Sequence, residues 1–138
     1  MNSVQELQLM YHKLLQSAIY GRTLNIATKA NDTTRVDEIS KTTYDRIVNW
    51  LNTTDFYKAP ASTQYHESYV GGLCQHSINV ANIASDLCEL PIFENKVDKN
   101  SAVLIALMHD WCKINYYEPY MRNVKNDQTG QWEQKQAF

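Results

Sequence analysis

The sequence has few of the residues that interrupt regular structure, with four glycines and three prolines among 138 residues. Collagen-like, low-complexity and disordered chains need many more of them, so a folded globular protein is expected. Its three cysteines, Cys74, Cys88 and Cys112, form no C-x-x-C pair. A disulfide framework or a zinc knuckle is therefore not expected, and the thiols fit a reducing compartment.

Long apolar runs are also lacking. The longest covers residues 102–108, whereas a helix that crosses a bilayer needs roughly 20 apolar residues. The first ten residues have neither the basic stretch nor the apolar stretch of a secretion signal. These features predict a cytoplasmic protein without a membrane segment.

Charge of one sign is not in large excess, because 13 Lys and Arg residues face 15 Asp and Glu residues. The net charge of −2 gives no overall positive field that would attract nucleic acid or an anionic membrane. It does not exclude a local basic groove. The length suits one domain over residues 1–138.

Apolar residues recur at helical spacing in four segments, which predicts an all-α bundle. Ser3 followed by Glu6 is typical of a capping box at the first helix, and Gly21 is expected to end it. The body of the fourth helix is apolar on every side, so it should be the buried central helix. The N-D-Q-T-G segment favours a short C-terminal β-hairpin. The expected elements are helices at about 3–20, 34–52, 72–89 and 100–113, an ordered loop over 53–72, and a hairpin over 120–136.

His76 occupies a predicted core-facing stripe of the third helix. The stripe consists of Leu73, His76, Val80, Ile83 and Leu87. A polar ring in such a place loses hydration unless both of its nitrogens find partners. A metal ion with an acceptor behind the ring meets that need, and so does a hydrogen-bonded core histidine. His76 alone leaves both interpretations open.

His109 and Asp110 end the predicted fourth helix, and Lys113 follows within one turn. One imidazole nitrogen and one carboxylate oxygen suit Mn, Fe, Co, Ni or Zn better than calcium. A plain ion pair between Asp110 and Lys113 is the alternative for this segment. Taken together, the spacing H-x9-H from His66 to His76 and the following HD-x-x-K predict a metal or phosphate site. His12, on what is expected to be a solvated face of the first helix, is given no role.

The segments YHESYVGGLCQHSINVANIA and ALMHDWCKINYY resemble the HD superfamily of metal-dependent phosphohydrolases. They are most similar to the subgroup with H-x4-GGL-x-x-HS before HD-x-x-K, which includes HD domains of exoribonucleases and small HD proteins common in phages. The resemblance implies an HD-domain-like helical bundle. In it His76, His109 and Asp110 would hold a divalent ion (Mn, Fe, Co, Ni, Zn or Mg), and His66 and Lys113 would line the phosphate side.

The chain departs from the family pattern after the HD pair. HD enzymes of this kind complete the site with a further Asp on a helix downstream, whereas the later carboxylates here are Glu118, Asp127 and Glu133 in the predicted hairpin region. We therefore expect a member that lacks the family's C-terminal helices, with impaired activity. Apolar helix faces left uncovered would favour a homodimer.

Hydrolysis of a nucleotide or oligonucleotide phosphate ester is the function that the resemblance predicts. Asp110, Lys113 and His66 would be the catalytic residues. Lys113 and His66 would bind the phosphate, and His66 would act as general acid or hydrogen-bond donor. A degenerate HD fold that binds a nucleotide or a protein partner is the first alternative. The second is a single-stranded nucleic-acid surface near the hairpin, made of Tyr116, Tyr117, Tyr120, Arg122, Lys125 and Trp132.

Overall fold

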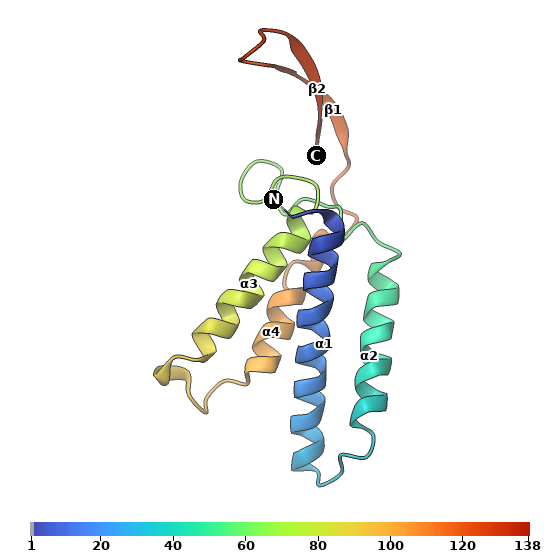
Figure 1. Cartoon of the computed structure of the whole chain (residues 1–138), viewed down its shortest axis with the longest axis vertical. Helices are drawn as coiled ribbons and strands as arrows, with labels where there is room; N and C mark the ends of the chain where they lie inside the picture. The colour runs from blue at the N-terminus through green and yellow to red at the C-terminus, as the bar shows by residue number, and fades with distance from the viewer. Residues whose placement is uncertain (1) are drawn as a thin grey trace.

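Four helices run side by side in the computed structural model, which describes residues 2–138 (Figure 1). They are α1 (Val4–Lys29), α2 (Val36–Leu51), α3 (Gly72–Cys88) and α4 (Lys99–Met108). α1 lies in the middle, with α2 packed on one side and α3 and α4 on the other. The expected helical fold with a C-terminal hairpin is thus confirmed.

α1 begins as predicted, because the Ser3 hydroxyl accepts the backbone N–H of Glu6 at 3.1 Å. The predicted end at Gly21 is wrong, since the helix continues to Lys29. A glycine inside a helix costs only about 1 kcal/mol relative to alanine. At this position a Cβ would lie 2.5 Å from the Asn100 side chain, so the glycine allows the segment that starts α4 to approach α1 closely.

α4 is shorter than predicted. Its α-helical part ends at Met108, and the chain continues through His109 and Asp110 into the 3-10 turn η2 (Trp111–Lys113). It is also not buried all round, because Ile105 is 69 % exposed while Val103 and Leu107 are buried. One side of α4 therefore faces solvent, and the prediction of a central helix is wrong; α1 holds that place.

α3 turns a different face to the core than the sequence predicted. The predicted stripe is buried only at Leu73, and its far end is outside, with Ile83 59 % and Leu87 48 % exposed. The buried face consists of Gly72, Leu73, Cys74, Ser77, Ile78 and Ala81. Small side chains on this face allow closer approach of the neighbouring helices. His76 consequently lies at the border of the core and not within it.

Tyr11 ties α1 to the end of α4 from within the core. Its hydroxyl donates to the carbonyl of Leu107 at 2.7 Å and accepts from the Trp111 indole N–H at 3.2 Å. Burial raises the pKa of Tyr11 far above its ordinary value, so the hydroxyl stays a donor. These two bonds flank His109 and Asp110 in the chain and hold that segment against α1.

The loop between α2 and α3 folds back on itself. Its backbone is held by hydrogen bonds from Ala61 N to Glu67 O at 3.0 Å and from Gly71 N to Lys58 O at 3.0 Å. A Cβ on Gly72 would lie 1.8 Å from the Glu67 carbonyl oxygen. Gly72 therefore lets the loop lie directly on the start of α3.

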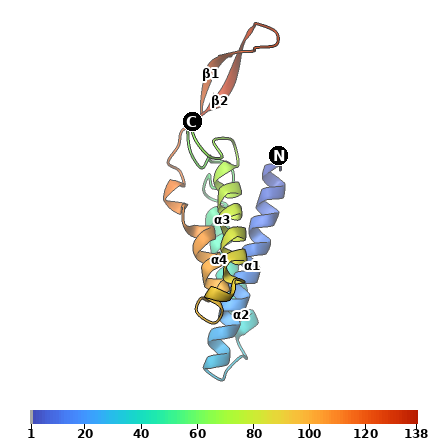
Figure 2. The same cartoon turned by 90° about the vertical axis from the view of Figure 1, so that its left-hand side faces the viewer.

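The hairpin pairs β1 (Tyr120–Lys125) with β2 (Trp132–Ala137) in antiparallel register, with Tyr120 opposite Ala137. Gly130 has φ 72° in the connecting turn, a conformation that favours glycine. Figures 1 and 2 show the hairpin extending away from the helices at the end where the α2–α3 loop lies. No helix within residues 2–138 combines the length and apolarity that crossing a membrane requires.

Candidate metal centre

Three side chains from two packed helices meet at the loop end of the bundle. His76 comes from α3, and His109 and Asp110 follow directly after the last residue of α4. His76 Nε2 lies 3.3 Å from His109 Nε2, and each of these nitrogens lies 3.5 Å from Asp110 Oδ2. The structure thus brings together the three residues that the sequence proposed as ligands.

The spacing of these three atoms fits a common divalent ion. Metal ligands of this kind sit about 2.1 Å from the ion, and a tetrahedral arrangement then separates any two of them by about 3.4 Å. The observed separations of 3.3, 3.5 and 3.5 Å match that value. Two imidazoles and one carboxylate suit a first-row transition metal and leave positions open for water and substrate.

His109 is oriented by the backbone of its own helix. Its Nδ1 lies 2.6 Å from the Ala106 carbonyl oxygen, so Nδ1 carries the proton and donates it to that acceptor. In the neutral ring the opposite nitrogen, Nε2, then holds a lone pair. This arrangement leaves Nε2 free to bind an ion, and it arises because α4 ends at Met108 with His109 at its C-cap.

The cluster is partly shielded from solvent. The side chains of His76, Asp110 and His109 are 21 %, 16 % and 31 % exposed. Burial lowers the pKa of His76, and the nearby carboxylates of Glu67 and Asp110 oppose that effect only in part. A lowered pKa keeps the His76 ring neutral near pH 7, which is the form that binds a metal.

Lys113 reaches back to the cluster from η2. Its ammonium donates to the Ala61 carbonyl at 2.7 Å and to Asp110 Oδ2 at 3.2 Å. The ion pair with Asp110 that the sequence left open is therefore present. An ammonium has three donors, so one N–H remains for an incoming anion. Lys113 also ties the α2–α3 loop to the cluster of His76, His109 and Asp110.

His66 lies on the outer rim of the same cluster. Its ring centroid is 4.6 Å from that of His76 at an angle of 41°, and the residue is exposed. The loop thus brings the first histidine of H-x9-H next to the second. This exposed place beside the ligands suits contact with a substrate.

Glu67 is the residue that the sequence analysis missed. Its Oε2 lies 3.4 Å from His76 Nδ1, and it forms a second metal-capable group with His66 and His76. The available signal was its place in the chain, directly after His66 and five residues before Gly72. Glu67 reaches His76 only because the loop folds back onto α3, and the spacing of residues in the sequence does not predict that fold.

His12 is not on a solvated face, contrary to the prediction. Its Nε2 lies 2.7 Å from the Tyr57 hydroxyl, and its ring packs edge-on against Tyr44 and Tyr57. Burial lowers the pKa of His12. It is a hydrogen-bonded histidine between α1 and the loop, outside both metal-capable groups.

The carboxylates that follow Asp110 stay outside the cluster. Within residues 2–138, neither metal-capable group includes Glu118, Asp127 or Glu133. Glu133 instead accepts a hydrogen bond from the Asn126 side chain at 2.9 Å within the hairpin. The described residues therefore supply three candidate ligands, His76, His109 and Asp110, with Glu67 and His66 beside them.

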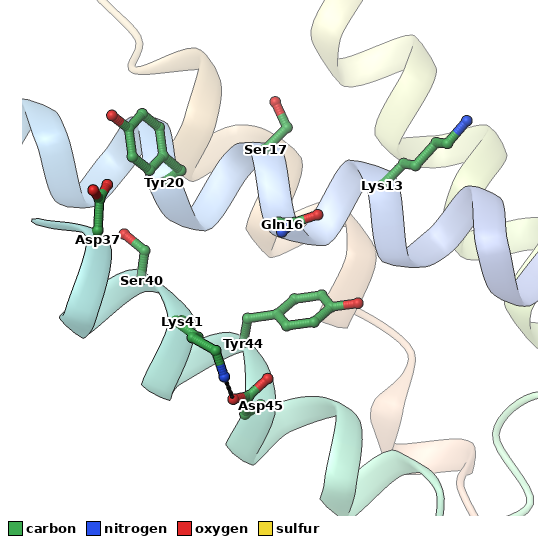
Figure 3. A pocket seen from close by; sticks show the side chains of 9 residues that line it. All are labelled: Lys13, Gln16, Ser17, Tyr20, Asp37, Ser40, Lys41, Tyr44 and Asp45. Carbon is green, nitrogen blue, oxygen red and sulfur yellow. Dashed lines mark hydrogen bonds and ion pairs between the residues drawn. The ribbon is translucent and has the colours of Figure 1, made fainter.

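A cavity of about 650 Å³ lies elsewhere, between α1 and α2 (Figure 3). Its lining residues are Lys13, Gln16, Ser17, Tyr20, Asp37, Ser40, Lys41, Tyr44 and Asp45. Charges of both signs share this cavity, and Lys41 pairs with Asp45 at 2.7 Å. None of its lining residues belongs to the metal-capable groups. Size alone does not make this cavity the site, because it gathers no residues that point to a reaction.

Part of the chain is similar to a curated protein. It is 34 % identical over 74 residues to a dihydroneopterin 2′,3′-cyclic phosphate phosphodiesterase from Methanocaldococcus jannaschii. The match covers 52 % of this chain and 28 % of that protein, so the chain spans less than a third of the relative's length. Comparisons with known protein families and with solved structures find no match.

Proposed function

We propose that the chain is a metal-dependent phosphohydrolase of the HD type that cleaves a phosphate ester of a nucleotide or a nucleotide-like compound. The observation that carries this proposal is the triangle of His76 Nε2, His109 Nε2 and Asp110 Oδ2, with sides of 3.3 to 3.5 Å. The similarity to a cyclic phosphate phosphodiesterase supports the reaction class. The HD motif and its spacing support the family.

The residues of the cluster divide into ligands and substrate contacts. His76, His109 and Asp110 would hold the ion, which supplies positive charge for a phosphoryl oxygen and lowers the pKa of a water molecule. Lys113 would donate its remaining N–H to the phosphate as a point charge. His66, on the rim, would donate a hydrogen bond to the phosphate or a proton to the leaving oxygen.

Turnover assays with a matched variant test this function. The substrates are a phosphodiester reporter, 2′,3′-cyclic nucleotides, mononucleotides and a short oligonucleotide, each with Mn²⁺, Co²⁺, Ni²⁺, Zn²⁺ or Mg²⁺. We expect metal-dependent hydrolysis that Asp110→Asn abolishes and that Asp127→Asn, in the hairpin turn, leaves unchanged. Binding of a metal and a nucleotide without turnover would instead identify a binding module, and activity retained in Asp110→Asn would refute the proposal.

A second candidate function is supported by the hairpin. Arg122 of β1 stands directly opposite Lys135 of β2, and like charges in that position disfavour the pairing. Trp132 is 70 % exposed and Tyr120 is 52 % exposed, so aromatic and cationic groups share this projecting element. Such a surface suits the bases and phosphates of a single strand.

Binding of a fluorescent single-stranded oligonucleotide tests the hairpin surface. Affinity should fall as salt rises and should drop in Arg122→Gln and Lys135→Gln. Lys96→Gln, in the exposed connection before α4, is the control and should bind like the unaltered protein. Absence of binding at low salt would remove this candidate.

A further inference from the structure

Glu67 places a carboxylate on the side of His76 that faces away from the proposed ion. Its Oε2 lies 3.4 Å from His76 Nδ1, while His76 Nε2 faces His109 and Asp110. We propose that Glu67 is a positioning residue that accepts the Nδ1–H of His76. It thereby fixes the tautomer in which the Nε2 lone pair points to the ion. This inference rests on the proposed metal site for its functional meaning.

The Glu67 oxygen that faces His76 is an orphaned buried acceptor. Oε2 is buried and makes no hydrogen bond within residues 2–138, and a buried carboxylate oxygen without a donor is costly. The separation of 3.4 Å from His76 Nδ1 is longer than a formed N–H···O bond. The proposal requires this contact to shorten, and hydrogen bonds that are long in an unliganded site commonly tighten when the ligand arrives.

The other oxygen of Glu67 is held from α3. Asn79 Nδ2 donates to Glu67 Oε1 at 3.4 Å, and Gln75 Nε2 donates to Asn79 Oδ1 at 2.8 Å. Gln75 and Asn79 lie on either side of His76 along the same helix. The carboxylate is therefore anchored to the helix that carries the histidine that it would orient.

The backbone of Glu67 also indicates a role beyond turn formation. Glu67 has φ 44°, a left-handed conformation that glycine and asparagine adopt more readily than glutamate. The conformation is kept by the hydrogen bond from Ala61 N to Glu67 O and lies directly beside the cluster. Strained residues that persist at such places are commonly part of the site.

Glu67 would determine how many lone pairs the cluster presents to a cation. With the Nδ1 protons of His76 and His109 donated to Glu67 and to the Ala106 carbonyl, both Nε2 atoms hold lone pairs. They converge with Asp110 Oδ2 at 3.3 to 3.5 Å. In this tautomer the 3.3 Å contact between the two Nε2 atoms would not be a hydrogen bond. Three electron-rich atoms would meet with no hydrogen between them, and a bound cation would relieve their repulsion. An acceptor behind a metal-binding histidine has this effect in many metal sites.

A second ion between His66, Glu67 and His76 is the competing interpretation, because these residues also form a metal-capable group. His76 would then use Nδ1 for one ion and Nε2 for the other. A neutral imidazole has only one unprotonated nitrogen, so this arrangement requires removal of the second proton. One ion with Glu67 behind the ring avoids that requirement.

The tautomer of His76 in the metal-free protein tests the inference without any ion. Nitrogen-15 NMR of the histidine rings at pH 8, with the His76 signals assigned by His76→Gln, distinguishes Nδ1–H from Nε2–H. We expect Nδ1–H for His76 in the unaltered protein. In Glu67→Ala we expect a mixture of the two tautomers, with the His109 ring unchanged.

Metal affinity measured by calorimetry with Mn²⁺ and Zn²⁺ gives the second readout. Glu67→Ala should weaken binding about 10- to 100-fold. Glu67→Gln keeps an acceptor oxygen and should lose less. Glu67→Gly should bind as weakly as Glu67→Ala while its thermal midpoint is maintained, because glycine tolerates the positive φ. Glu94→Ala, at an exposed position, is the control and should bind normally.

The outcomes separate this inference from the proposed function. An Nε2–H tautomer in the unaltered protein, unchanged affinity in Glu67→Ala, or two ions per chain would each overturn the role of Glu67. If the unaltered protein binds no ion, the proposed function fails, and the tautomer experiment alone decides whether Glu67 orients His76.

Discussion

Asp110 is the residue on which the cluster converges. Its Oδ2 lies within 3.5 Å of both imidazoles and 3.2 Å from the Lys113 ammonium. One carboxylate oxygen therefore serves the proposed ion and a fixed positive charge together. Lys113 holds the carboxylate in place, and its charge also opposes a cation bound beside it.

Replacing Lys113 should separate these two effects. In Lys113→Met we expect inorganic phosphate to bind at least about tenfold more weakly, because one charge-assisted hydrogen bond is lost. Divalent metal should bind as tightly as before or more tightly, since the competing charge is gone. Calorimetric titration with each ligand measures both, with Lys96→Met as the control. Unchanged phosphate affinity would contradict a role of Lys113 on the phosphate side.

The cysteines differ in their surroundings, and their reactivity should follow. Burial raises the pKa of the Cys74 thiol to about 12, and its S–H faces the Leu7 carbonyl at 3.7 Å, whereas Cys112 is exposed. Since the thiolate is the reactive form, Cys112 should be modified by a disulfide reagent at pH 8 well before Cys74. Cys74 should react only on unfolding. Peptide mass spectrometry identifies the site, and early modification of Cys74 would contradict its burial.

At the residue scale, the sequence predicted that His76, His109, Asp110, Lys113 and His66 belong to one site, because the resemblance to the HD pattern rests on these residues and their spacing. It missed Glu67 and misjudged His12. Both depend on contacts between distant parts of the chain: Glu67 meets His76 only because the loop folds onto α3, and His12 meets Tyr57 across α1 and the loop. No local pattern encodes either contact.

At the scale of elements, α4 leads directly into two of the proposed ligands, His109 and Asp110, and it begins with a side-chain cap. The Asp98 carboxylate accepts from the Ser101 N–H at 3.0 Å and from the Ser101 hydroxyl at 2.6 Å. These bonds, the hydroxyl first, lower the pKa of Asp98 below its ordinary value of 3.8. The charged form is therefore the one that stabilises the helix.

Asp98→Ala should lower the free energy of unfolding by about 1 kcal/mol at pH 7, the usual value of an N-cap. Because the folded pKa is depressed, the cap contributes fully above the unfolded value and is lost as pH falls through the folded pKa. The difference between the two proteins should thus shrink below pH 3.8. Urea denaturation at pH 7 and pH 3 checks this, and a difference that grows in acid would contradict it.

Gly72 at the start of α3 is a second element-scale feature. A Cβ there would lie 1.8 Å from the Glu67 carbonyl oxygen, so Gly72→Ala must push the loop away from the helix. We expect a loss of about 2 to 3 kcal/mol in unfolding free energy, together with weaker metal binding because Glu67 moves. Gly130→Ala is the matched control in open space and should cost about 1 kcal/mol. Equal costs would contradict the packing of the loop.

Helix boundaries were predictable where a local signal exists. The Ser3 cap, the start of α3 at Gly72 and the hairpin turn all lie as expected. The end of α1 and the facing of α3 were not predictable, because both follow from packing. Gly21 stays helical where the segment at Asn100 comes close, and α3 buries Cys74, Ser77 and Ala81 in place of Ile83 and Leu87.

At the scale of the whole molecule, the proposed site lies where the helical bundle meets the α2–α3 loop. Exposed apolar side chains remain on α3, on η1 (Pro91–Phe93) and on α4, among them Ile83, Ile92 and Ile105. The expected homodimer stays a prediction. The hairpin, which projects from the loop end, gives the same end of the molecule its aromatic and cationic surface.

Anomalous diffraction from crystals of the protein grown with Mn²⁺ or Zn²⁺ would locate a divalent ion bound directly after α4. We expect a single anomalous peak per chain, about 2.0 to 2.2 Å from His76 Nε2, His109 Nε2 and Asp110 Oδ2. Crystals of Asp110→Asn should lack this peak. A peak at other residues, or no peak at saturating metal, would refute the proposed metal site.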